Sequence, residues 1–600
     1  MAIYEKMHYK ECFPDDTIQR LKKILDDCGI EIVETVPLTS SINTQSLRIS
    51  IKGTDIGTNG KGMNNAYARA SAYAEFFERF QNAILGHTMP NSAIPFVVAS
   101  DERMMSPADL FDKSNSNAFF DFYFSERGML DSSLAEKIKR FTSVNRFDKS
   151  DPCGMYLTLP FYSVKNQKVV YLPYSSYSAM YGSNGMCAGN TREEALVQGL
   201  SEIVERIVQR RIFLEKPALP DMPLEYIQKY PDIYEMFVKA NSNPKYTVFI
   251  KDCSFGGKYP VVALCIIEKN TGKYGLKLGC HPNIGIALER TFTEITQGID
   301  IFEYSRKRSW LDFSNNSVDT PDNISNSFKI GLSQYPYQLF AHTPDYPFTD
   351  LERKVGQSNA DILKSWIYDF LPEYDILIRD VSYTGFPSFH IIIPGLSEMQ
   401  RVTDFDFRVR NTRSFVAYLL SHPEEIHSEN VKYIIGVLKA YSSSIYENSL
   451  STYFPPDFIT ALPFAELGSD VYLLAMCYVL KGRYTDAKQC ISLLRKRAKS
   501  EHFNVDDTCR DMLDCIYYYL SGMCEIGDHK NVMEYLHTFF TNDLCDRVDW
   551  IFNKPDLVVQ KQYSDIIVRR LPYFDDFRCK LAAKYGHIKL DQMDNADMFD

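Results

Sequence analysis

The sequence lacks several patterns that would assign it to a common class of protein. Its fourteen cysteines stand singly and form no CxxC pair, which argues against a zinc ribbon or a thioredoxin-type site. No apolar run reaches roughly 18 residues, the length of a membrane span, and the first residues, MAIYEKMHYK, lack the apolar core of a signal peptide. The net charge of −11 argues against a nucleic-acid-binding surface. We therefore expect a cytoplasmic protein with reduced thiols that binds neither membranes nor nucleic acid.

Signatures of common nucleotide-binding and hydrolytic enzymes are also missing. The sequence has no GxxxxGK[ST] loop, no HRD/DFG pair and no HExxH, GxSxG or zinc-deaminase pattern. Cys280 and His281 are neighbours in the sequence, and we interpret both as structural. Any catalytic site must therefore be built from other residues.

The chain is long enough for more than one domain. Six hundred residues exceed a single hydrophobic core, and the composition, 45% apolar and 24% charged, is ordinary for a globular protein. Strand and helix signals alternate up to residue 398, whereas helical periodicity prevails from about 404 to 589. We predict an α/β (α+β) domain over 1–398, with helices packed on mixed sheets. We predict an all-α domain over 399–600, with pairs of helices like tetratricopeptide repeats and a frayed acidic tail; an irregular helical bundle is the alternative.

Three predicted helices carry carboxylate and amide side chains on one face. The first covers about 65–85 and contains SAYAEFFER, the second covers 194–206 and reads EALVQGLSEIVER, and the third covers about 284–304 and contains ALERTFTEITQG. Spacings of three, four and seven residues place the polar side chains of each helix in one stripe. The stripes consist of Ser71, Glu75, Glu78 and Arg79; Gln198, Glu202, Glu205 and Arg206; and Glu294 and Gln297.

Glycine-containing segments precede all three helices. They read GTNGKG, YGSNGMCAG and GCHPNIG, and we interpret the first as a glycine-rich turn. Backbone N–H groups at such helix starts can bind phosphate. Thr191 and Glu194 form a T-x-x-E pattern, which predicts a capping box for the second helix.

The stripes allow two interpretations. A single stripe is most often a solvated face with surface ion pairs, and that alternative stays open. However, the surrounding residues are apolar or small, which predicts buried helices, and buried carboxylates must be paired, protonated or bound to metal. If the helices converge, their glutamates outnumber Arg79 and Arg206, and divalent cations with oxygen ligands would neutralise the surplus charge. We therefore predict a magnesium–nucleotide site whose metal ligands are Glu75, Glu78, Glu202, Glu205 and Glu294.

At these residues the sequence resembles the YcaO family of ATP-dependent enzymes. The SxxxExxER, ExxxQxxxExxER and ExxQ helices of that family match Ser71–Arg79, Glu194–Arg206 and Glu294–Gln297, and the resemblance covers roughly residues 1–398. It implies that the five glutamates bind ATP through Mg²⁺, and it makes Glu75, Glu202 and Gln297 candidate catalytic residues. Thr17 and Cys187 stand where the family usually has serine. The implied nucleotide shell consists of Lys10, Thr17, Ser71, Asn184, Gln198, Arg206 and Gln297.

The resemblance also implies a chemistry and partners. Family members use ATP to phosphorylate an amide oxygen after a nucleophile has added to the carbonyl; a side-chain nucleophile gives an azoline and sulfide gives a thioamide. This chain ends ADMFD, without the proline-rich PxPxP tail of many azoline formers, which makes azoline formation a weaker expectation. It looks most like a stand-alone bacterial subgroup regarded as accessory to β-methylthiolation of an aspartate in a small-subunit ribosomal protein.

We therefore expect an ATP-hydrolysing enzyme that activates an amide or carboxyl group. The alternatives are a non-catalytic ATP-binding scaffold for a methylthiotransferase, and a cyclodehydratase that forms thioamides or azolines on peptides. The expected partners are a protein or peptide substrate, such as a ribosomal protein, a radical methylthiotransferase docked on the helical C-terminal domain, and a second copy of the chain in a homodimer.

Overall fold

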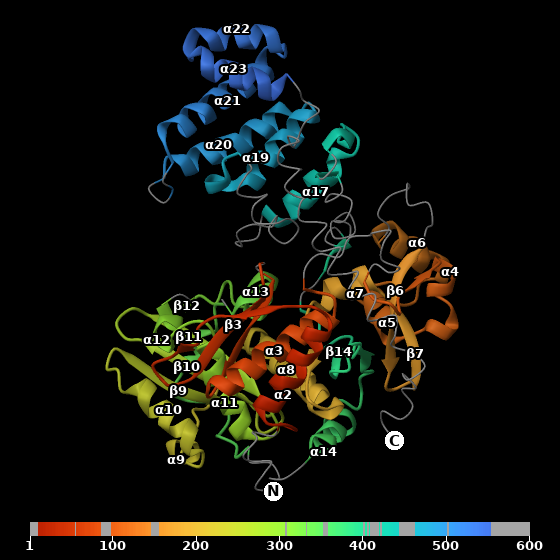
Figure 1. Ribbon diagram of the computed structural model, residues 1–600, viewed down its shortest axis with the longest axis vertical. Coiled ribbons are helices and arrows are strands. Elements are labelled where there is room, and N and C mark those ends of the chain that lie inside the picture. The colour runs from red at the N-terminus through yellow and green to blue at the C-terminus, as the bar shows by residue number, and fades with distance from the viewer. Residues whose placement is uncertain are drawn as a thin grey trace.

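The computed structural model shows three β-sheets surrounded by helices, followed by a separate group of helices (Figure 1). The predicted acidic tail lies outside the described residues. Those residues are 10–553, except 54–55, 86–97, 146–154, 307–308, 332, 352–357, 400–401, 405–406, 408–418, 421–422, 443–462, 501–502 and 504.

The chain begins with two helices packed on a small sheet. Helices α2 (Pro14–Asp27) and α3 (Asn65–Gln81) share one apolar core with this sheet. Helix α2 begins two residues after Cys12, with Pro14 in its first turn and Phe13 at the N-cap position. The strands of the sheet are β1 (Ile32–Glu34), β2 (Leu38–Thr39), β3 (Gln45–Ile51) and β4 (Gly57–Gly62), paired in the order β1-β3-β2 with β4 on β3.

The segment GTNGKG is a strand, so its prediction as a turn is wrong. It forms β4 and pairs antiparallel with β3 over its whole length. The reason is the close approach of α3: a Cβ atom at Gly60 would lie 2.0 Å from the carbonyl oxygen of Ala68. Only glycine leaves room for the helix backbone there, and the glycines therefore serve helix packing and not chain reversal.

The two larger sheets enclose the long helix α8 (Arg192–Glu215) (Figure 1). Its apolar residues pack on one side against β8 and β14 and on the other against β10 and β11. One sheet has the order β12-β11-β10-β9, and the other has the order β5-β6-β13-β14-β8, with β7 paired to β6. Their strands are β5 (Arg103–Met105), β6 (Tyr156–Ser163), β7 (Lys168–Pro173), β8 (Met186–Ala188), β9 (Tyr246–Asp252), β10 (Val261–Glu268), β11 (Lys273–Cys280), β12 (Ser309–Trp310), β13 (Leu377–Asp380) and β14 (Ser388–Ile392).

The sequence predicts mixed sheets. In the described part of the chain, however, every strand pair is antiparallel. The hairpin predicted near 154–175 is confirmed as β6 and β7. The outer faces of the two larger sheets are covered by shorter helices. These are α4 (Pro107–Leu110), α5 (Ala118–Ser125), α6 (Leu134–Asn145), α7 (Tyr174–Tyr181), α9 (Leu224–Ile227), α10 (Pro231–Asn241), α11 (Ile284–Ile295) and α12 (Ile301–Arg306). Helices α13 (Pro321–Ile330) and α14 (Asn359–Lys364) instead contact α8.

The helix predicted over 284–304 is two helices. α11 ends at Ile295 and α12 begins at Ile301, and Gly298 between them has φ 72°. That backbone conformation is one that glycine adopts readily and that ends a helix. Gln297 therefore lies in the turn after α11, and not on its face.

The helices after residue 420 have a core of their own. In the described residues of this region every regular element is helical, and their buried side chains pack among themselves. Gly482 and Gly527 lie in the turns of two predicted helical hairpins, with φ of 70° and 73°. No helix in the described ranges combines the length and hydropathy of a membrane span. The helices are α17 (Val431–Ser442), α19 (Ala465–Leu480), α20 (Tyr484–Ala498), α21 (Asp507–Glu525), α22 (His529–Phe539) and α23 (Asn542–Phe552).

A buried ion pair fixes the sheet that carries β13. Arg379 on β13 donates two hydrogen bonds to Asp101, of 2.7 and 2.9 Å, and the Tyr383 hydroxyl donates a third, of 2.9 Å. Both charged side chains are only 3% exposed. Removing one partner would leave the other charge buried and uncompensated, which typically costs about 3–5 kcal/mol.

We therefore predict that Asp101→Asn lowers the free energy of unfolding by about 3 kcal/mol or more. Urea denaturation followed by circular dichroism measures this change. The matched control is Asp507→Asn, because Asp507 also pairs with an arginine but is 91% exposed, and we expect no measurable loss. Equal stability of the two variants would show that the Asp101–Arg379 pair does not hold the sheet.

Candidate functional site

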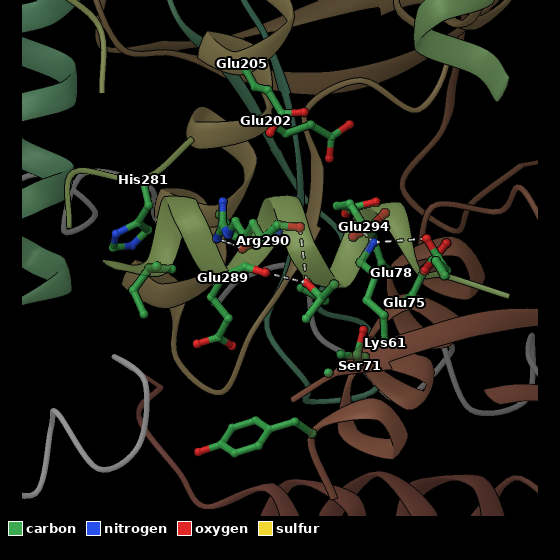
Figure 2. Close-up of a pocket in the computed structure, with 18 of the residues that line it drawn as sticks. Lys61, Ser71, Glu75, Glu78, Glu202, Glu205, His281, Glu289, Arg290 and Glu294 are labelled. Carbon is green, nitrogen blue, oxygen red and sulfur yellow. Dashed lines mark hydrogen bonds and ion pairs between the residues drawn. The ribbon is translucent and has the colours of Figure 1, made fainter. Parts of the chain in front are cut away.

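The polar stripes of α3, α8 and α11 face one pocket (Figure 2). The pocket has a volume of about 570 Å³. It extends along α8 from Glu194 to Gln209, a span of about 22 Å at the rise of an α-helix. Leu276, Lys277 and Leu278 also line it, and consecutive strand residues can do so only if the strand presents its edge.

Helix α8 supplies the middle of the pocket. Gln198, Glu202, Glu205 and Arg206 all line it, whereas the other sides of the helix are buried against the two sheets. Arg206 pairs with Glu202 one turn earlier, with 2.8 Å between Nη2 and Oε1. The spacing of three and four residues therefore produces one polar stripe on an otherwise apolar helix, as the sequence predicts.

Helix α3 supplies a second wall. Its N-cap residue Asn64 accepts a hydrogen bond from the backbone N–H of the third helical residue, which fixes the start of the helix after β4. Glu75 and Glu78 reach the pocket, and Arg79 lies 3.8 and 3.4 Å from their carboxylates. Ser71, one turn before Glu75, also lines the pocket.

Lys61 joins the second wall to the third. It projects from β4 and forms an ion pair with Glu294 of α11, and its ammonium also donates a 3.3 Å hydrogen bond to Gln297 (Figure 2). The side chain of Gln297 in turn donates to the backbone carbonyl of Asn59. Strand β4, whose glycines allow its close contact with α3, thus also places the Lys61 ammonium among the glutamates.

Burial and neighbouring charges shift the pKa values of the glutamates in different directions. Burial raises the pKa of Glu78 to about 8 and the pKa of Glu205 to about 8, and it also raises the pKa of Glu75. Burial raises the pKa of Glu294 too. The nearby cations, among which Lys61 has the largest effect, outweigh burial and hold that pKa below its ordinary value. Burial of Lys61 disfavours its charge, yet Glu294 and Glu75 raise its pKa above the usual value. Burial therefore outweighs the nearby Arg79 charge at Glu75 and Glu78, whereas the cations around Glu294 outweigh burial.

Glu194 ties the start of the chain to α8. Thr191 is the N-cap residue and accepts from the backbone N–H of Glu194, so half of the predicted capping box is present. The Glu194 carboxylate does not complete the box: it accepts 2.8 Å from the backbone N–H of Glu11 and lies 3.4 Å from Lys10 Nζ. Thr17 donates 2.7 Å to Asn190. Lys10 and Thr17 thus line the end of the pocket nearest the start of α8.

Asn184 is the one predicted site residue that does not line this pocket. It is buried, and its amide donates 2.7 Å to the carbonyl of Ser397, while its own Oδ1 accepts no hydrogen bond within the described residues. All other predicted residues line the pocket: Lys10, Thr17, Ser71, Glu75, Glu78, Gln198, Glu202, Glu205, Arg206, Glu294 and Gln297.

The charge in the pocket is closer to balance than the sequence predicts. Seven glutamates line it together with six lysines and arginines, so the surplus is one negative charge if all are ionised. Sequence reasoning missed Lys61, Lys277 and Arg290, because single basic residues on strands or beside a stripe form no recognisable pattern. It also read His281 only as structural, although His281 is both buried and part of the pocket lining. Burial, with Arg290 and Lys10 nearby, holds the pKa of this histidine well below its ordinary value.

The residues that the structure describes contain no preformed group of three or more acidic, histidine or cysteine side chains around one metal position. Lys61, Arg79 and Arg206 instead lie between the glutamates. The set of donors still suits a hard divalent cation, because it consists of carboxylate and amide oxygens. Burial raises the pKa of both Glu78 and Glu205 to about 8, and a bound cation would displace the protons that these carboxyl groups hold below that pH.

Comparison with known proteins identifies the family. A protein-family model described as a YcaO cyclodehydratase that binds ATP and Mg²⁺ matches residues 59–397, more than half of the chain. The chain belongs to the YcaO family. It is 31% identical over 414 residues to the ribosomal protein S12 methylthiotransferase accessory factor YcaO of Escherichia coli K12, which covers 66% of this chain and 67% of that protein. It is 29% identical over 414 residues to an uncharacterised protein of Haemophilus influenzae, with 67% and 68% covered.

Solved structures also match part of this chain. A heterocyclase in complex with substrate and cofactor matches with a TM-score of 0.45 and 18% identity over 67% of this chain. This chain spans only 55% of the length of that heterocyclase. YcaO from Methanopyrus kandleri bound with AMPPCP and Mg²⁺ matches with a TM-score of 0.40 and 15% identity over 65% of this chain and 93% of that protein.

Family membership confirms the two expected cofactors, ATP and Mg²⁺. Both helices with the ExxER sequence and the third helix with ExxQ lie inside the matched range. Lys10 and Thr17 precede it, so their place beside the pocket rests on the contacts of Glu194 and Asn190 alone.

We predict that Glu194→Ala loosens the chain around Lys10. The variant loses hydrogen bonds to a buried carboxylate, each worth about 1.5–3 kcal/mol, so local opening should rise by roughly tenfold or more. Limited digestion with trypsin, followed by mass spectrometry, measures the rate of cleavage after Lys10. The control is Glu193→Ala in the same helical turn, which we expect to cleave like the unaltered protein. Unchanged cleavage of Glu194→Ala would mean that other contacts hold this segment.

Proposed function

We propose that the protein is an ATP- and Mg²⁺-dependent enzyme that activates an amide or carboxyl group of a protein or peptide by phosphorylation. The observation that carries the proposal is the convergence of three helices, which bring Glu75, Glu202 and Glu294 to one pocket with Lys61 among them. In this reaction the γ-phosphoryl group passes to the acceptor oxygen, ADP leaves, and inorganic phosphate departs after a nucleophile has added to the carbonyl carbon. Mg²⁺ supplies stabilisation of the charge on the transferred group.

The residues then take distinct roles. Glu75, Glu202 and Gln297 would act on the reacting groups. We assign metal binding to Glu75, Glu78, Glu202, Glu205 and Glu294. Gln297 is held by Lys61 and the β4 backbone, which fixes the direction of its amide. Asn184 would contribute only by supporting the loop before α8, because it donates to the Ser397 carbonyl. The nucleotide shell would consist of Lys10, Thr17, Ser71, Gln198 and Arg206.

The 31% identical relative from Escherichia coli is named as an accessory factor of a ribosomal protein methylthiotransferase, and this supports a similar role in ribosomal protein modification. The helices after residue 420 support a second role, the docking of a partner protein, because they form their own core. A groove of about 1040 Å³ lies between the starts of α19 and α21 and one side of α23, and Trp550 lines it. We propose domains at 1–398 and 399–600, with tetratricopeptide-like pairs in the second, and a cytoplasmic homodimer.

Two other candidate functions are distinguishable. A non-catalytic scaffold would bind ATP tightly with negligible turnover in the presence of any partner. A thioamide- or azoline-forming cyclodehydratase would change the mass of a peptide by exchange of oxygen for sulfur or by loss of water. If the stripes served only as ion pairs, isothermal titration with ATP and Mg²⁺ would show no heat.

We predict that Glu75→Gln and Glu202→Gln each lower ATP hydrolysis by about a hundredfold or more, because each removes a charge that would hold Mg²⁺ or the transferring group. Release of phosphate in the presence of Mg²⁺ measures the rate, and isothermal titration measures nucleotide binding. Glu215→Gln is the control, since it lies on the same helix but pairs with Arg211 at its exposed end. Hydrolysis at the normal rate by either pocket variant would refute the site assignment.

We predict that the full-length protein captures a protein substrate whose intact mass differs between cells with and without it. Affinity capture followed by intact-mass analysis identifies the partner and the chemical change together. Trp550→Asp should reduce capture, because Trp550 is 52% exposed and lines the groove. Phe539→Asp serves as the matched control, because Phe539 is 79% exposed but does not line the groove. Equal capture by both variants would exclude the groove as the docking site.

A further inference from the structure

The pocket is longer than the region occupied by the predicted ATP and Mg²⁺ residues. Beyond Glu205 it continues along α8 to Gln209, where Phe328, Gly331 and Tyr335 complete its lining. Gln209 donates 2.6 Å to the hydroxyl of Tyr335, so this end carries a hydrogen-bonded polar pair. None of these residues belongs to the predicted nucleotide shell or the set of metal ligands.

Lys277 is the cation of this far end. It lies on β11 and lines the pocket, and a Cβ atom at Gly331 would lie 3.2 Å from its ammonium nitrogen. The glycine thus leaves space beside the charge. In the described part of the chain the Lys277 ammonium forms neither a hydrogen bond nor an ion pair, although its charge acts on Glu205 and Glu294 over a longer distance. Each of the other basic residues in the middle of the pocket has a partner: Lys61 contacts Glu294, Arg206 contacts Glu202, and Arg290 contacts Gln198.

An ammonium group that lines a pocket without a partner favours a ligand oxygen with negative charge. The lining also includes an aromatic side chain, Phe328, whose ring lies 5.7 Å from the Arg206 guanidinium carbon. The far end therefore combines one available donor, one aromatic ring and one hydrogen-bonded polar pair. Such a combination fits a short peptide segment better than a second nucleotide, because only one cation is available.

The geometry of phosphoryl transfer indicates from which end of the pocket the acceptor approaches the phosphates. In transfer from ATP, the attacking oxygen and the leaving oxygen lie roughly in line, on opposite sides of the phosphorus. If the nucleoside lies toward Lys10 and Thr17, and the phosphates lie at the glutamates, the acceptor must approach from the Lys277 end. We propose that the far end of the pocket is the acceptor subsite, and that Lys277 binds the carbonyl or carboxylate oxygen of the peptide group that receives the phosphoryl group.

This inference rests on the proposed function for the place of the nucleotide, and it adds the site of the second substrate. Lys277 would hold the acceptor oxygen next to the transferring group, and its positive charge would stabilise negative charge that develops there. The shared chemistry is a carbonyl oxygen, which has two sources: a side-chain carboxylate and a backbone amide.

Two small probes distinguish these sources: N-acetyl-aspartate N-methylamide offers a carboxylate, and N-acetyl-alanine N-methylamide offers only backbone amides. Saturation-transfer NMR with the full-length protein, Mg²⁺ and the non-hydrolysable analogue AMPPCP detects weak binding of either. We expect saturation of at least one probe with the unaltered protein, its loss with Lys277→Met, and its recovery with Lys277→Arg. The matched control is Lys273→Met, on the same face of β11 but exposed, which should leave the signal unchanged.

Isothermal titration with Mg²⁺ and AMPPCP, carried out on the same samples, distinguishes failure of the ATP site from failure of the acceptor subsite. Lys277→Met should still bind the analogue, because Lys277 is outside the nucleotide shell, and any change in affinity reports the loss of its longer-range charge on Glu205 and Glu294. If the unaltered protein does not bind the analogue, the proposed function fails. If it binds the analogue but saturates neither probe, or saturates a probe equally after Lys277→Met, the acceptor subsite is refuted while the ATP site stands.

Discussion

The arrangement of the pocket depends on how the negative charge of its buried carboxylates is neutralised. Helix α8 is enclosed by two sheets, so its polar stripe can reach only the pocket. Each glutamate there must be neutralised by a cation, a proton or a bound ligand. Lys61 neutralises Glu294, whereas Glu78 and Glu205 hold protons near neutral pH because burial raises the pKa of each to about 8. A cation bound in the pocket would displace these protons.

The sheets serve this arrangement by bringing distant segments together. The small sheet places β4 and Lys61 against α3, and the edge of β11 places Lys277 beside the second half of α8. Close approach is possible because glycine occupies the contact points, as at Gly60. The helices carry the acidic groups, and the strands carry two of the basic ones. Neither set forms a site alone.

The stripes could be predicted from the sequence because helical periodicity converts a spacing of three or four residues into a shared face. That rule placed Glu75, Glu78, Glu202, Glu205 and Glu294 correctly around one pocket. It failed for the basic residues, since a lysine on a strand has no such periodic signal. It failed also where tertiary contact decides the local structure: GTNGKG has the composition of a turn, yet pairing with β3 makes it a strand. The place of Asn184 away from the pocket depends on packing with Ser397, more than 200 residues away, which no local pattern reveals.

The turn after α11 has a consequence for how the site can vary. Because Gly298 ends the helix, Glu294 is positioned by the helix axis, but Gln297 is positioned by the turn and by its bonds to Lys61 and Asn59. Glu294 and Gln297 are three residues apart, but different parts of the structure therefore determine the positions of their side chains. A change in the turn can redirect the amide while the carboxylate stays in place, so related proteins can alter the handling of a substrate without rebuilding the part of the pocket that binds cations.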